Sequence, residues 1–359
     1  MAVGTTAATF AKRQKIKACW SYVCSCENRA LRQPRGPFGD GSRILKSRPA
    51  VVSPCAVNTV TPNIYPTMPA RPDADMVARY REDGYLAFAQ VLTPEEVREA
   101  SDGINALVRK FAFNEALTEH VGSRYGENIK NGRGLLFKSR SSDFHFQVEG
   151  GYEARPDRLD ELADNIRKFQ SYTGELPIYD YLANRHPRLR ALLEAVLGEG
   201  CALYSSMALC KPAAIGSEKP WHQDLAYFAV NRLDGVCGVW IALDRAVVAN
   251  GCMHVIPGGH RTGPRRHYWS KVDCEITTEE VNPADAVAIE LPPGGLMIFD
   301  GLLPHETPAN RSDLRRRALQ FHYRSAATQV VPKAEFRKSF VGPDALFIGC
   351  DYSAVEPQS

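Results

Sequence analysis

Residues 236–260 have the sequence VCGVWIALDRAVVANGCMHVIPGGH, and this stretch shows the pattern that organises the second half of the chain. Two short apolar segments, Val236–Leu243 and Cys252–Ile256, are separated by the turn sequence Ala249-Asn250-Gly251. The second segment ends at Pro257-Gly258-Gly259. Short apolar runs bounded by Gly, Asn and Pro are typical of buried β-strands. The stretch therefore predicts two strands with a tight turn region between them.

The same alternation of apolar segments and turns recurs from Cys201 onward, for example at Pro292-Pro293-Gly294-Gly295. Many short strands with regular turns, preceded by helices, indicate a mainly β fold with flanking helices. We therefore expect a double-stranded β-helix, the jelly roll of cupin-like proteins. The other predicted strands are Ala202–Leu209, Leu225–Val230, Val287–Leu291, Leu296–Phe299 and Ala318–Tyr323.

Helical signals dominate the first half of the chain. A first helix is expected from Asp73 to a stop at Gly84, and Thr93-Pro94-Glu95-Glu96 is a capping box that begins a second. A leucine stripe after Pro187 predicts another helix. Residues 120–160 are polar and glycine-rich, so we expect a long, mobile connection that lines a substrate entrance. The domain is expected to span residues 73–330, followed by a C-terminal extension over 331–359.

Charge is distributed unevenly along the 359 residues, although the net charge is only +3. Residues 1–70 contain ten Lys and Arg against two acidic residues, whereas the remainder contains 34 against 39. The body therefore lacks the basic excess expected of a nucleic-acid-binding protein. No apolar run approaches the roughly 20 residues that a membrane span requires.

The basic leader over residues 1–70 is rich in Ala, Ser, Thr and Pro, which is typical of an organelle transit peptide. A plastid is favoured over a mitochondrion because the first ten residues carry no charged side chain. The alternatives are a disordered arm or a start site placed upstream of Met68, and either would leave the protein cytoplasmic.

Cysteine usage in the body does not suggest a disulfide framework. The six cysteines outside the leader are scattered, and none forms a C-x-x-C pair. We expect reduced, buried thiols. These residues are Cys201, Cys210, Cys237, Cys252, Cys274 and Cys350.

This strand-rich region contains a candidate set of metal-binding residues. Trp221-His222-Gln223-Asp224 contains an H-x-D triplet, and side chains alternate along a strand, so His222 and Asp224 would share one face. His305 would complete a two-histidine, one-carboxylate face, which suits non-haem Fe(II) and oxygen chemistry. Arg316, eleven residues after His305, offers a cationic fork for the carboxylate of a co-substrate.

These motifs, taken together, resemble the phytanoyl-CoA dioxygenase family of Fe(II)/2-oxoglutarate oxygenases. The resemblance covers roughly residues 73–330. It is carried by Asp83-Gly84-Tyr85, Leu92 to Glu96, Lys211-Pro212, Trp221 to Phe228, Asn250 to His260 and Pro304 to Arg316.

The resemblance implies a double-stranded β-helix and an enzyme that consumes 2-oxoglutarate and O2 and hydroxylates a C–H bond of a small-molecule or acyl substrate. It implies that His222, Asp224 and His305 ligate Fe(II) and that Arg316 pairs with the remote carboxylate of 2-oxoglutarate. Three further residues would line the co-substrate pocket: Lys168, Met207 and Trp240.

Other interpretations remain open from the sequence. His254, His260 and His322 lie in the same strand-like segments and are alternatives to His305 as third ligand. A catalytically silent binding or sensor protein, or a Zn(II) hydrolase with the same ligands, is an alternative function. Halogenation is disfavoured because Asp224 occupies the position that related halogenases leave to chloride. Neither the primary substrate nor the oligomeric state follows from these motifs.

The leader makes a direct prediction about targeting. A fluorescent protein fused behind residues 1–70 should enter an organelle, a plastid in preference to a mitochondrion, because the leader is basic and poor in acidic residues. Microscopy of the fusion checks this. A diffuse cytosolic signal would reduce the leader to a disordered arm or a misplaced start.

Overall fold

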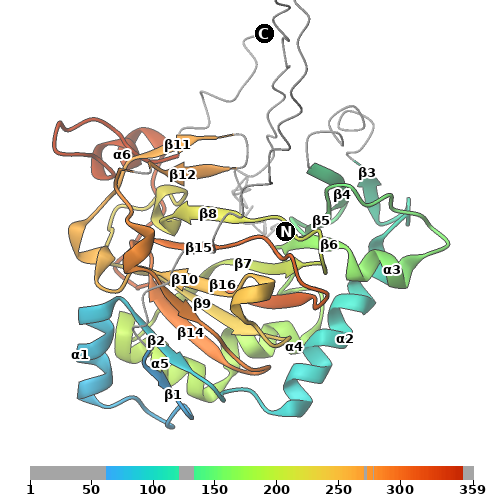
Figure 1. Cartoon of the computed structure of the whole chain (residues 1–359), viewed down its shortest axis with the longest axis horizontal. Coiled ribbons are helices and arrows are strands. Elements are labelled where there is room, and N and C mark those ends of the chain that lie inside the picture. Colours follow the sequence, from blue (N-terminus) through green and yellow to red (C-terminus); the bar gives the residue numbers. More distant parts are fainter. Residues whose placement is uncertain (1–61, 121–132, 271–272, 278, 351–359) are drawn as a thin grey trace, which may run out of the picture.

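Two β-sheets face each other in the computed structural model, which describes residues 62–120, 133–270, 273–277 and 279–350 (Figure 1). This is the predicted double-stranded β-helix. The large sheet has the order β1 (Ile64–Tyr65), β2 (Tyr85–Phe88), β14 (Leu296–Asp300), β9 (Val236–Ala242), β16 (Arg316–Arg324), β7 (Ala202–Lys211), β6 (Ile166–Gln170), β5 (His145–Glu149), β4 (Arg133–Ser139) and β3 (Thr118–His120). The small sheet has the order β13 (Val287–Ile289), β10 (Met253–Val255), β15 (His305–Thr307) and β8 (Lys219–His222), and a separate hairpin pairs β11 (His267–Trp269) with β12 (Cys274–Ile276).

The central strand β9 is apolar throughout because both of its faces are buried. Trp240 and Ala242 point into a core between the two sheets, whereas Val239 and Ile241 point into a second core on the outer face. A strand buried on both faces has an unbroken hydrophobic sequence instead of an alternating one. This explains the continuous run that begins at Val236.

Helices cover the outer face of the large sheet, as predicted. Asp73 caps α1 (Ala74–Asp83), and Gly84 ends it in the left-handed conformation. The capping box of α2 (Pro94–Phe111) is present, with Thr93 accepting from the backbone of Glu96. The remaining α-helices are α3 (Leu159–Asp164), α4 (Pro177–Asp180), α5 (Pro187–Leu197) and α6 (Lys333–Ser339). A short π-helix, η2 (Tyr181–Arg185), follows α4. The 3-10 helices are η3 (Asp224–Ala226), η4 (Val248–Asn250), η5 (Gly259–Thr262) and η6 (Pro283–Asp285).

Two expectations about the chain's organisation need correction. Ordered structure begins before residue 73, because β1 pairs in parallel with β2 and Met68 is buried in the core. Residues 133–149, expected to belong to a connection, form β4 and β5 at one end of the large sheet. None of residues 135–160 lines the pocket that contains His222 and His305. Residues 121–132, and most of the predicted leader (1–61), lie outside the described residues.

The predicted strand over Leu225–Val230 is also wrong, although the other six are present. Asp224 instead starts the 3-10 turn η3, in which the amide of Tyr227 donates to the carbonyl of Asp224. The apolar residues that suggested a strand, such as Leu225 and Phe228, pack in a third core with Phe340. Burial next to the C-terminal extension therefore accounts for their sequence pattern.

A disulfide between Cys274 and Cys350 corrects the expectation of reduced thiols. It links the β11–β12 hairpin to Cys350 in the C-terminal extension. The amide of Cys350 also donates to the carbonyl of Ala226, close to Asp224 in the sequence. No local motif predicts this pair, because 76 residues separate its members. The four other body cysteines are free and buried, as expected.

No helix in the described part of the chain is long and apolar enough to cross a membrane.

Gly238 is a packing position that connects the fold to the site. A Cβ at this position would come within 2.2 Å of the Phe299 ring, and that ring packs edge-on against His305 at 4.8 Å between centroids. We expect Gly238→Ala to lower the free energy of unfolding by about 1–3 kcal/mol through overpacking. It should also weaken metal binding at His305. Chemical denaturation measures the first effect and calorimetric metal titration the second.

Gly174→Ala is the matched control, because nothing lies within 4 Å of its added Cβ. Its unfolding free energy should stay within about 0.5 kcal/mol of the wild-type value. Equal stability of the two variants would contradict the packing argument.

Candidate metal centre

Strand pairing brings the two predicted histidine ligands together. In the antiparallel β8–β15 pair, His222 lies directly opposite His305. Their ring centroids are 4.1 Å apart, and both side chains are buried. Directly opposed residues of an antiparallel pair project from the same face of the sheet. The register of two short strands therefore places imidazoles that are 83 positions apart in the sequence side by side.

Backbone carbonyls fix the tautomer of both histidines. Nδ1 of His222 lies 2.8 Å from the carbonyl oxygen of Pro220, and Nδ1 of His305 lies 2.9 Å from that of Leu303. A carbonyl only accepts, so each Nδ1 carries the proton and donates. Each Nε2 is left with a lone pair that faces the site, which is the usual arrangement of metal-binding histidines.

Gln223, which sequence reasoning did not single out, holds the bend that presents Asp224. Its amide nitrogen donates to the carbonyls of Gly263 and Leu302, and its amide oxygen accepts from the backbone of Arg265. Gln223 is completely buried. Three hydrogen bonds therefore hold the middle residue of H-x-D in place. They fix the backbone that presents Asp224, although β8 already ends at His222.

The two oxygens of Asp224 have different partners. Oδ1 faces the ligand histidines, 3.4 Å from Nε2 of His222 and 3.8 Å from Nε2 of His305. Oδ2 lies 2.7 Å from Nε2 of His322 and also accepts from Gln320. His322 is therefore not a substitute for His305. It is a fully buried hydrogen-bond donor that orients the carboxylate.

Burial and charge keep Asp224 and His305 in the protonation states that a metal requires. Burial alone would raise the pKa of Asp224, but His322, His305 and His222 outweigh it and hold this pKa well below its usual value. Burial, and then the neighbouring His222, lowers the pKa of His305 to about 3. The carboxylate is thus anionic and the His305 imidazole neutral at ordinary pH.

The donor set fits a first-row divalent metal. One atom from each of His222, Asp224 and His305 lies within 4.8 Å of the others, and all three residues are buried. Two imidazoles and one carboxylate on one side of a cation leave its other positions open, as in non-haem Fe(II) oxygenases. Among the described residues this is the only such group of His, Cys, Asp and Glu.

Arg316 lies in the same cavity as the three ligands, and it is fully buried. It donates to the carbonyl of Leu209, but its Nε has no partner in the described structure. Burial lowers its pKa to about 10, so it remains a cation. The flanking arginines have acid partners instead: Arg317 pairs with both oxygens of Asp244, and Arg315 pairs with Asp164 and Asp244.

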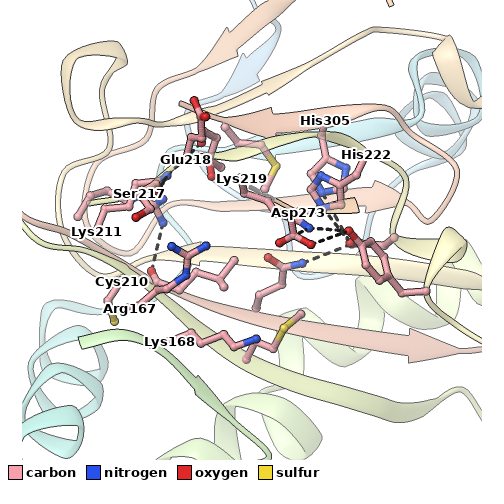
Figure 2. Close-up of a pocket in the computed structure, with 18 of the residues that line it drawn as sticks. Arg167, Lys168, Cys210, Lys211, Ser217, Glu218, Lys219, His222, Asp273 and His305 are labelled. Carbon is pink, nitrogen blue, oxygen red and sulfur yellow. Dashed lines mark hydrogen bonds and ion pairs between the residues drawn. The ribbon is translucent and has the colours of Figure 1, made fainter. Parts of the chain in front are cut away.

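Of the three other residues predicted to line the co-substrate pocket, two line the cavity and one packs against Arg316 instead. Lys168 and Met207 line the pocket, and Figure 2 shows Lys168 along one wall of it. Trp240 is not among the lining residues. Its ring lies 5.4 Å from the guanidinium carbon of Arg316, so it packs behind the arginine as a cation–π partner. His254 and His260 are outside the ligand group.

A double-stranded β-helix with a buried His–Asp–His group and an arginine in the same cavity defines a non-haem Fe(II)/2-oxoglutarate-dependent dioxygenase. Comparison with known proteins gives the family. Residues 80–318 match the family model of phytanoyl-CoA dioxygenase (PhyH), and the chain belongs to that family.

Relatives and solved structures agree with this assignment. Phytanoyl-CoA dioxygenase domain-containing protein 1 of Danio rerio is 25% identical over 257 residues, covering 68% of this chain and 88% of that protein. Phytanoyl-CoA dioxygenase 1 of Oryza sativa subsp. japonica is 28% identical over 252 residues, covering 67% and 84%. EvdO2 from Micromonospora carbonacea var. aurantiaca, solved as a complex with 2-oxoglutarate, is 25% identical with a TM-score of 0.50 and covers 72% of this chain and 93% of that one. EctD from S. alaskensis, at 17% identity and a TM-score of 0.52, covers 74% of this chain and 84% of that one and supports the fold alone.

Asp224 provides the sharpest test of the metal centre. Asp224→Ala removes the anionic ligand and leaves both imidazoles, so Fe(II) affinity should fall by more than about a hundredfold, the upper range for loss of a mere supporting residue. Anaerobic calorimetry with Fe(II), or with Mn(II) as a stable substitute, measures this.

His254→Ala is the control for Asp224→Ala. His254 is a buried histidine of the same small sheet that lies outside the ligand group, so the variant should keep its metal while losing some stability. Full iron affinity in Asp224→Ala would show that the ligand set is wrong.

Proposed function

We propose that this dioxygenase hydroxylates an unactivated C–H bond of a small-molecule or acyl substrate and releases succinate and CO2 from 2-oxoglutarate. The observation that carries the proposal is one cavity that contains both the complete His222–Asp224–His305 group and the buried cation of Arg316. A metal with open positions matches the keto-acid end of 2-oxoglutarate, and a cation without an acid partner matches its distal carboxylate.

Fe(II), when bound, supplies the activation of O2 and the oxidation of the substrate, and the protein supplies binding, orientation and exclusion of water. His222 and His305 keep their Nε2 lone pairs directed at the metal because their Nδ1 protons are held by the backbone. Asp224 is held in one orientation by His322. These ligands are all at most 5% exposed, so bulk water has little access to them.

The walls of the cavity support a compact organic substrate. Leu209, Phe228 and Met253 give it apolar surface. Near His222, Lys219 pairs with Asp273 at 2.9 Å and donates to the hydroxyl of Tyr227. This polar group offers hydrogen bonds to a polar part of a substrate, and Figure 2 shows Lys219 and Asp273 among the residues that line the pocket. The walls suit either a small metabolite or the acyl end of a larger molecule.

Substrate-dependent succinate formation tests the reaction. The Fe(II)-loaded protein should be incubated with 2-oxoglutarate, O2 and a panel of acyl-CoAs and small metabolites. We expect one panel member to gain one oxygen atom and to accelerate succinate release in equal amount. Zn(II) in place of Fe(II) should abolish both. Turnover with Zn(II) and without O2 would instead establish a hydrolase.

Arg316 should set the affinity for the co-substrate. Removal of one partner of a buried charge pair costs about 3–5 kcal/mol, so Arg316→Ala should raise the 2-oxoglutarate KM by more than about a hundredfold. Arg316→Lys should restore only part of the affinity for 2-oxoglutarate, since an ammonium lacks the planar fork of a guanidinium. Steady-state kinetics with varied 2-oxoglutarate checks both.

Arg315→Ala is the matched control, because Arg315 pairs with Asp164 and Asp244 on the other face of the strand. Its KM for 2-oxoglutarate should change by less than about twofold, in keeping with the small energies of surface ion pairs. An unchanged KM in Arg316→Ala would contradict this role.

A further inference from the structure

Lys211, the last residue of β7, lies directly opposite Arg316, the first residue of β16. Both line the cavity, and both are buried, with exposed fractions of 4% and 0%. The ammonium of Lys211 donates to the carbonyl oxygens of Ser217, at 2.5 Å, and Thr307, at 3.0 Å. An ammonium has three N–H groups, so one remains for a further acceptor.

Neither of these cations has a carboxylate within ion-pair distance among the described residues, whereas two other cations of the pocket do. Lys219 pairs with Asp273 at 2.9 Å, and Arg167 pairs with Glu149 at 3.4 Å. Burying a charge without a counter-charge is expensive. Two such cations side by side repel each other, and burial followed by the charge of Arg316 holds the pKa of Lys211 well below its ordinary value.

The fold nevertheless reserves space for the Lys211 side chain. A Cβ on Gly216 would come within 2.8 Å of the Cβ of Lys211. A Cβ on Gly251 would meet the carbonyl oxygen of Pro308 first, at 2.2 Å, and would also come within 3.1 Å of the Cδ of Lys211. Gly251 also has a left-handed backbone, with φ at +79°. Two glycines on separate loops thus flank the lysine stem and keep its path to the cavity clear.

We propose that Lys211 is a second cation for the distal carboxylate of 2-oxoglutarate, acting together with Arg316. This inference rests on the proposed function and adds a binding residue to it. Figure 2 shows Lys211 at the opposite end of the drawn pocket from His222 and His305. An anion there supplies the counter-charge that both cations lack, while the keto-acid end of the same molecule reaches the metal.

The test compares two ligands that differ only at the distal end. 2-Oxopentanoate keeps the keto-acid and the chain length of 2-oxoglutarate but has a methyl group in place of the distal carboxylate. Their dissociation constants should be measured anaerobically by calorimetry on the Mn(II)-loaded full chain, wild type and Lys211→Met. A hydrogen bond to a charged group contributes enough for the variant to bind 2-oxoglutarate about ten- to a hundredfold more weakly. Binding of 2-oxopentanoate should change by less than about twofold, because this ligand has no group for the lysine.

A purely structural role gives a different result. If Lys211 only ties the carbonyls of Ser217 and Thr307 together, both ligands weaken equally, and the proposal is overturned. Lys219→Met is the matched control for the loss of a pocket lysine, and it should leave the ratio of the two dissociation constants unchanged. If Lys219→Met changed this ratio as much as Lys211→Met, the overall positive charge of the pocket would explain the preference for 2-oxoglutarate, and the proposal would again be overturned.

Two further outcomes keep the inference separate from the proposed function. Should Lys211→Met fail to fold, Lys211→Gln, which retains a donor for the carbonyls without the charge, decides by the same ratio. A wild-type protein that does not bind 2-oxoglutarate better than 2-oxopentanoate would contradict the proposed function itself. A wild-type preference that survives unchanged in the lysine variants would contradict only the role of Lys211.

Discussion

The antiparallel register of β8 against β15 is the constraint on which the rest of the site depends, because it sets His222 opposite His305. A shift of one residue in either strand would turn its imidazole to the other face of the small sheet and away from the other imidazole. Neighbouring features hold this register. Gln223 anchors the chain beyond β8, and Phe299 packs against His305 from the large sheet, in the space that Gly238 leaves open. The metal centre is thus a product of the packing of two sheets.

Charge is arranged along the cavity in a way that matches a bifunctional co-substrate. At one end, the carboxylate of Asp224 is surrounded by imidazoles that stabilise its anionic form. At the other end, Arg316 and Lys211 lie together without an acid partner among the described residues. The surrounding cations, such as Arg317 and Lys219, are neutralised by protein carboxylates. Arg316 and Lys211 therefore lack a counter-charge that a bound anionic ligand would supply.

Much of this arrangement follows from the sequence, but only where the signal is local. The strand pattern predicted the jelly roll, and the spacing of His305 and Arg316 predicted that they share a site with His222. The sequence could not show that Asp224 lies beyond the end of β8, since the bend depends on hydrogen bonds from Gln223 to Gly263 and Leu302. His322 could be noticed but not assigned, because its role depends on the register of β16 against its neighbours. The disulfide likewise joins residues that only the tertiary fold brings together.

The visible absorption of the anaerobic protein tests the central claim most directly, namely that one cavity binds Fe(II) and 2-oxoglutarate together. Keto-acid chelation of Fe(II) in such a site gives a weak charge-transfer band that neither component gives alone. The account predicts that the band appears on addition of 2-oxoglutarate to the Fe(II)-loaded protein and saturates at one equivalent of each per chain. Bound Fe(II) that yields no band at saturating 2-oxoglutarate would contradict it.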